Sequence, residues 1–146
     1  MKCRHEARDI IRNAVRASEH DRVLFEGSGA TGAIHRLIHA LNFTSPPVVL
    51  VCPYSHHSSL LPWKELGATV VRIKQSSDGT ICMRYLEETL QKYEKCNGDL
   101  IGCFTKASNV SGILLDDIAI TKLLHKYNAL SFWDYATAGK FFVFKY

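Results

Sequence analysis

Three glycines in the stretch GSGATG, Gly27, Gly29 and Gly32, have the spacing G-x-G-x-x-G and follow a short apolar run. This spacing is typical of a loop that turns tightly and presents the free N–H groups of the next helix to a phosphate. Ser28 and Thr31 add hydroxyl groups that can donate to phosphate oxygens. The stretch therefore predicts an anion site at the start of a helix.

A dinucleotide is not the ligand that the rest of the sequence favours. A nicotinamide or flavin dinucleotide site also needs an Asp or Glu at the end of the second strand, which binds the ribose hydroxyls. Here that strand ends in VLVCPYSHHSS, without an acidic residue, and the P-loop pattern G-x-x-x-x-G-K-[ST] does not occur. The glycine stretch alone is also compatible with a plain strand-to-helix turn that binds nothing.

Polar side chains that follow later apolar runs suit a flat aromatic ring that carries a phosphate. His56 or His57 could stack on such a ring, and Asn109 could donate to a ring oxygen. Asp134 ends the segment ALSFWD, where a carboxylate could keep a ring nitrogen protonated and make the ring an electron sink. Each residue alone could be a loop residue, a turn former or a helix cap. Together they predict a pyridoxal-phosphate site.

Short apolar runs alternate with amphipathic segments along the chain, a pattern typical of an α/β domain with a mostly parallel sheet. In such sheets ligands lie beyond the carboxyl ends of the strands. The polar stretches GSGATG, PYSHHSS, KASNVSG and DYATAG should therefore meet at one edge. The pattern predicts helices over 5–19, 31–41, 60–66, 83–95 and 116–127, and strands over 22–25, 48–52, 69–73, 100–105 and 129–134.

Composition indicates one soluble globular domain. The 146 residues are 47% hydrophobic and 22% charged, and the net charge of +4 is not concentrated in a basic run, so nucleic-acid binding is not indicated. No apolar run is long enough to span a membrane, and the N-terminus lacks the apolar core of a secretory signal. Five cysteines without a C-x-x-C pair indicate reduced thiols and a cytoplasmic location. Cys52 and Cys103 should be buried.

Two other pairs of residues have simpler explanations than catalysis. His35 and His39 have the spacing of metal ligands on a helix, but no third ligand is evident, so no metal site is predicted. Asp116 and Asp117 come where a helix is expected to begin, and both should act as caps.

Three stretches together resemble the class V aminotransferase family of pyridoxal 5′-phosphate (PLP) enzymes, which includes the cysteine desulfurases. They are FEGSGATGAIHRL, PYSHHSSLLPWKELGATVV and ASNVSGILLDDIAITKLLHKYNALSFWDYATAG, and the resemblance runs from about residue 22 to residue 139. It implies a three-layer α/β/α large domain of fold type I, an amino-acid substrate, cysteine desulfurase-like or transaminase-like chemistry, and a homodimer. The alternative is a non-catalytic or scaffold module that binds the cofactor phosphate.

The resemblance also implies which residues contact the cofactor. Asn109 would contact the ring oxygen or the substrate carboxylate, and Asp134 would pair with the pyridine nitrogen. The family often has a glutamine three residues after this aspartate, which bonds the phenolic oxygen, and Thr137 takes its place here. The cofactor phosphate would be bound by Gly29, Ala30 and Thr31. His56 would stack on the face of the pyridine ring.

The resemblance finally implies an incomplete domain. The family's aldimine-forming lysine lies in a Ser-x-His-Lys context further along the chain, whereas Lys140 and Lys145 are the only lysines after Asp134 and lack that context. The terminal run GKFFVFKY resembles a strand without a covering helix, and a small C-terminal domain is not in the sequence. We therefore expect residues 1–146 to form a single incomplete large domain that is inactive alone.

Overall fold

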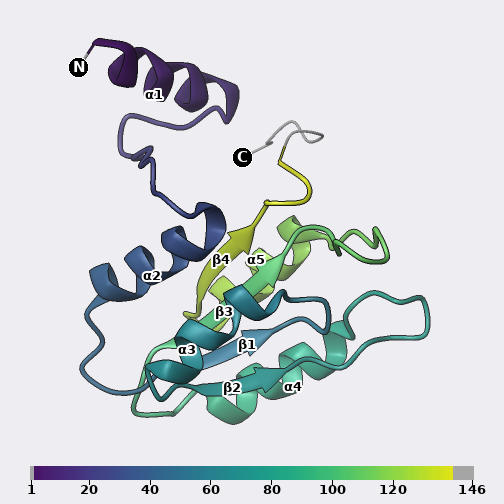
Figure 1. The fold of residues 1–146 in the computed structure, drawn as a ribbon. Coiled ribbons are helices and arrows are strands. Elements are labelled where there is room, and N and C mark those ends of the chain that lie inside the picture. Colours follow the sequence, from purple (N-terminus) through teal and green to yellow (C-terminus); the bar gives the residue numbers. More distant parts are fainter. Residues whose placement is uncertain (1, 140–146) are drawn as a thin grey trace.

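The computed structural model describes residues 2–139 and shows helices packed around one parallel sheet (Figure 1). The four strands have the order β2-β1-β3-β4, and every pair of neighbours is parallel. The strands are β1 Val48–Val51, β2 Thr69–Arg72, β3 Leu100–Thr105 and β4 Leu130–Asp134. The helices are α1 Lys2–Ala14, α2 Gly29–Leu41, α3 Leu61–Glu65, α4 Met83–Tyr93 and α5 Asp117–Lys126, with a 3₁₀ turn η1 at His57–Ser59.

Helices cover both faces of the sheet, which gives the predicted α/β/α layers. Val48 and Leu50 of β1 pack with residues of α4 and α5, whereas Val49 and Val51 pack with residues of α2 and α3. This alternation follows from the period of two in a strand. Every residue of β1 and β3 is buried, as expected for central strands of a parallel sheet whose sequences are apolar except for Thr105.

The chain reverses its direction of travel across the sheet between β1 and β3. From β1 it crosses through α3 to β2, and from β2 it returns through α4 to β3 on the other side of β1. Ligands of open α/β sheets bind at such a reversal, beyond the carboxyl ends of the strands. The loops after β1, β3 and β4 therefore enclose the position where the sequence predicts a ligand.

Near the N-terminus one predicted strand is wrong and one predicted helix has different ends. Residues 22–25 form no strand, and Leu24 and Phe25 remain exposed because no neighbouring strand pairs with them. The helix predicted over 5–19 begins at Lys2 and ends at Ala14. Arg16 adopts the left-handed conformation with φ of 53°, which terminates a helix. Helix α1 buries none of its residues and lies away from the sheet (Figure 1).

The other predicted helices and strands agree with the structure to within two residues at each end. Cys52 and Cys103 are buried as predicted, and burial raises the pKa of the Cys103 thiol to about 11. Such a thiol stays protonated and unreactive at neutral pH. The predicted strand-like run and its two lysines, Lys140 and Lys145, lie outside the described residues.

Candidate cofactor site

A cavity of about 230 Å³ lies beyond the carboxyl ends of β1, β3 and β4. Five of the seven residues that the sequence assigns to the cofactor line it, whereas Gly29 and Thr31, the chain neighbours of Ala30, do not. The lining residues come from the start of α2, the ends of β3 and β4, and the segments that follow β1, β3 and β4: Ala30, Tyr54, His56, Ser58, Thr105, Ala107, Asn109, Asp134, Ala136 and Thr137. The fold thus brings distant segments of the sequence to one cavity.

Helix α2 begins beside this cavity with free N–H groups. The first four N–H groups of a helix have no partner within it, and the side chain of the preceding Ser28 makes no capping hydrogen bond. The first turn contains no acidic residue, so the positive end of the helix dipole is not offset there. This end of α2 suits an anion such as a phosphate.

Two glycines of the G-x-G-x-x-G stretch have conformational reasons to be glycine. Gly29 has a φ of 61°, a left-handed conformation that side chains disfavour. A Cβ atom on Gly32 would lie 1.9 Å from the carbonyl oxygen of Gly27, so only glycine allows this close approach. The tight entry into α2 therefore accounts for Gly29 and Gly32, whereas Gly27 has no such requirement.

Two donors fix the orientation of the Asp134 carboxyl group. Ser59 Oγ donates to Oδ2 at 3.2 Å, and the Ala136 backbone N–H donates to Oδ1 at 2.8 Å. Ser59 is buried and lies in η1, so the turn after β1 holds the residue that ends β4. Ser59 is not predicted from its residue type, although it directly follows the conspicuous stretch His56-His57-Ser58.

The His56 ring is held by its own turn. Its Nδ1 lies 2.7 Å from Ser58 Oγ and accepts from the Ser58 backbone N–H at 3.3 Å. Because Nδ1 is the acceptor in that bond, a neutral ring carries its proton on Nε2. The neighbouring His57 ring lies 3.9 Å away, centroid to centroid, but only His56 lines the cavity. The geometry therefore favours His56 over His57 as the ring that faces a ligand.

Asn109 lies in a loop that is held by hydrogen bonds between its own residues. The loop starts and ends at an antiparallel bridge between Ala107 and Leu114. Ser108 Oγ accepts from the N–H groups of Val110 and Ser111 at 3.3 and 3.1 Å, and the Ser108 carbonyl accepts from Gly112 N–H. These bonds hold the loop compact, so Asn109 reaches the cavity from a defined backbone.

No group of three or more His, Cys, Asp or Glu side chains within residues 2–139 could hold a metal ion, and this includes His35 and His39 of α2. None of the helices in this range is long and apolar enough to cross a membrane.

A sequence model of the aminotransferase class-V family matches residues 1–140. The chain belongs to this family. The match extends the resemblance seen in the sequence, which began at about residue 22, to include α1. A probable cysteine desulfurase of Halalkalibacterium halodurans is 28% identical over 140 residues, which cover 91% of this chain and 33% of the relative. A probable cysteine desulfurase of Chlamydia muridarum is 28% identical over 119 residues, covering 77% of this chain and 28% of the relative.

Solved structures of cysteine desulfurases have the same fold. The cysteine desulfurase CsdA of Escherichia coli superposes with a TM-score of 0.80 at 19% identity, over 97% of this chain and 36% of that structure. The apo cysteine desulfurase of Thermococcus onnurineus NA1 superposes with a TM-score of 0.74 at 20% identity, over 95% of this chain and 34% of that structure. The prediction of a fold-type-I large domain is confirmed. The chain spans about a third of the length of these relatives.

Proposed function

We propose that this chain binds PLP in the cavity beyond β1, β3 and β4, as the cofactor-holding part of a class-V enzyme. The observation that carries the proposal is the cavity itself. It gathers Ala30, His56, Asn109, Asp134 and Thr137 from four separate segments, and their chemistry matches the parts of one cofactor.

Each part of the cofactor has a chemical partner around this cavity. The N–H groups at the start of α2 suit the phosphate, and the oriented carboxyl group of Asp134 suits the ring nitrogen. The His56 ring suits stacking on the pyridine face, while Asn109 and Thr137 carry donors for its oxygen substituents. When bound, the cofactor supplies an electron-withdrawing ring, and this chain's residues hold that ring in place.

The substrate in this proposal is an amino acid, and the chemistry is cysteine desulfurase-like or transaminase-like. The names of the relatives from Halalkalibacterium halodurans and Chlamydia muridarum favour the first. A homodimer and a cytoplasmic location belong to the same proposal. The inactivity of residues 1–146 alone stays a prediction from the sequence.

Binding is tested with two probes that differ only in the phosphate. Pyridoxine 5′-phosphate carries an alcohol in place of the PLP aldehyde, so it does not condense with surface lysines. Equilibrium dialysis should show it binding about 10- to 100-fold tighter than pyridoxine, because hydrogen bonds to a charged group contribute about 1.5–3 kcal/mol. Inorganic phosphate should compete. Equal affinities for the two probes, or no binding of either, would contradict the proposal.

A further inference from the structure

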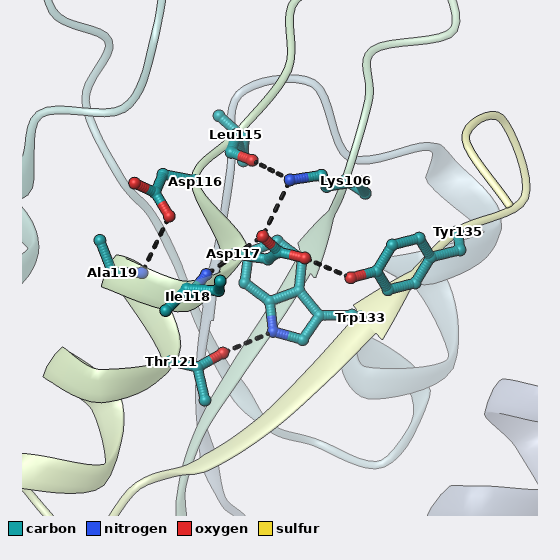
Figure 2. A network of polar contacts seen from close by, with 9 residues as sticks. All are labelled: Lys106, Leu115, Asp116, Asp117, Ile118, Ala119, Thr121, Trp133 and Tyr135. Atoms are coloured by element: carbon teal, nitrogen blue, oxygen red, sulfur yellow. Dashed lines mark hydrogen bonds and ion pairs between the residues drawn. The ribbon is translucent and has the colours of Figure 1, made fainter. Parts of the chain in front are cut away.

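Three polar side chains from separate elements form one network, and two of them are next in the chain to residues that line the cavity (Figure 2). Lys106 Nζ donates to Asp117 Oδ1 at 2.8 Å and to the Leu115 carbonyl oxygen at 2.8 Å. The Tyr135 hydroxyl donates to the other carboxylate oxygen, Asp117 Oδ2. Asp117 therefore binds a cation through one oxygen and a phenol through the other.

This network joins the bases of the two loops that carry candidate cofactor residues. Lys106 directly follows β3 and begins the loop of Asn109, and Tyr135 directly follows Asp134. The Leu115 N–H donates to the Lys106 carbonyl at 3.0 Å, so a backbone bond and the Lys106 ammonium both close the loop of Asn109. The Lys106 N–H in turn donates to the Asp134 carbonyl at 2.9 Å.

None of the three residues lines this cavity, although Lys106 and Tyr135 each lie between two residues that do. Tyr135 instead lines an adjoining cavity, which shares Asp134 with this one. The sequence predicted that Asp116 and Asp117 both cap α5, and this holds for Asp116, which accepts from Ala119 N–H at 3.0 Å. For Asp117 the prediction is incomplete. Its carboxylate accepts from the Ile118 N–H of the first turn at 3.1 Å and also from Lys106 and Tyr135 (Figure 2).

The network is mostly removed from water. The side chains of Lys106 and Asp117 are 12% and 25% exposed. Burial opposes ionisation of Asp117, yet its pKa is lowered overall because Lys106 and Tyr135 stabilise the carboxylate. A shielded ion pair contributes little net stability compared with apolar packing, but it requires one defined geometry. Such a geometry would keep the loop of Asn109 and the loop after Asp134 at a fixed distance from each other.

We infer that Lys106, Asp117 and Tyr135 are positioning residues that hold the loops of Asn109 and Asp134 in fixed relation to each other. Their connection with PLP rests on the proposed function, whereas the fixing of the loops does not.

The chain offers a matched control for this network. On α4 and α5, Lys126 Nζ donates to Glu87 Oε1 at 2.7 Å, and the Tyr127 hydroxyl donates to the same oxygen at 3.0 Å. This group also consists of a lysine, a carboxylate and a tyrosine, but it lies on the surface away from the cavity. Tyr135→Phe and Tyr127→Phe therefore remove the same hydroxyl from two similar networks.

Hydrogen–deuterium exchange without ligand tests the inference directly. Tyr135→Phe should raise the exchange rate about tenfold in residues 107–114 and 135–139, because a bond to a charged acceptor is lost. Exchange in β1 and α4 should stay unchanged, and Tyr127→Phe should leave both loops unchanged. Asp117→Asn, which keeps the side-chain shape, should loosen the same two segments. Unaltered exchange in the loops, or an equal increase along the whole chain, would overturn the inference.

A second measurement separates this inference from the proposed function. Tyr135→Phe should weaken binding of pyridoxine 5′-phosphate about fivefold, whereas Tyr127→Phe should not change it. If the unaltered protein binds no pyridoxine 5′-phosphate, the proposed function fails, and the exchange result still decides the inference because that experiment contains no ligand. Loosened loops with unchanged affinity would overturn the positioning role for the cofactor.

Discussion

Replacing Asp134 with alanine is expected to weaken binding of pyridoxine 5′-phosphate by about 100-fold. A carboxylate paired with a ring nitrogen makes a charge-assisted hydrogen bond, which is roughly twice as strong as a neutral one. The substitution also removes the acceptor of Ser59 Oγ and Ala136 N–H, so the loop after β4 loses two hydrogen bonds that shape the cavity. Equilibrium dialysis with the variant measures the loss.

Two control variants locate the effect at the ring nitrogen. Ser59→Ala keeps the carboxyl group and removes one bond to it, so a smaller loss of a few-fold is expected. Asp21→Ala removes an exposed carboxylate that accepts hydrogen bonds from nearby Ser18 and does not line the cavity. This variant should not change the affinity for pyridoxine 5′-phosphate. An Asp134→Ala protein that is folded by circular dichroism and binds as tightly as the unaltered protein would contradict the role given to Asp134.

Replacing Trp63 with alanine is expected to lower the free energy of unfolding by about 3–5 kcal/mol, the usual cost of removing a large buried aromatic side chain. Trp63 is fully buried on the α2 and α3 face of the sheet. Its ring lies 6.1 Å from the Phe43 ring and 6.4 Å from the Phe132 ring of β4, centroid to centroid. Urea unfolding followed by circular dichroism gives the difference.

Trp63→Phe is the matched variant, because it keeps an aromatic ring between α3 and β4. The free energy of unfolding is expected to fall by only about 1–2 kcal/mol, since the phenylalanine ring still fills part of the volume. A fall of less than about 1 kcal/mol in the free energy of unfolding of Trp63→Ala would contradict the tight packing described around Trp63.

The two inner strands of the sheet were predictable because short, almost entirely apolar runs are typical of strands buried on both faces. VVLV is apolar at every position and LIGCFT at every position except Thr105, and both lie in the middle of the sheet with helices on each face. The run at 22–25 has three apolar residues after Arg22 but no strand beside it in the structure, so it forms no strand, and Leu24 and Phe25 stay exposed. Strand formation depends on a pairing partner, which a local pattern does not reveal.

The candidate site was predictable where a residue type alone suggests its chemistry. Asp134, Asn109 and His56 follow apolar strands, and the parallel topology brings them to one edge. The supporting bonds were not predictable in this way. Ser59 and Asp134 are 75 positions apart, and their hydrogen bond depends on how the η1 turn packs against β4. The contact of Asp117 with Tyr135 likewise arises only once α5 is placed beside β4.

The family match, the fold and the cavity lead to one central claim, that the start of α2 binds the cofactor phosphate beside Asp134. Amide chemical-shift mapping of ¹⁵N-labelled protein during titration with pyridoxine 5′-phosphate tests it most directly. The account predicts the largest shifts at Gly29, Ala30 and Thr31, with further shifts at Asn109 and Ala136. Saturable binding that leaves the amides at the start of α2 unshifted would contradict the account.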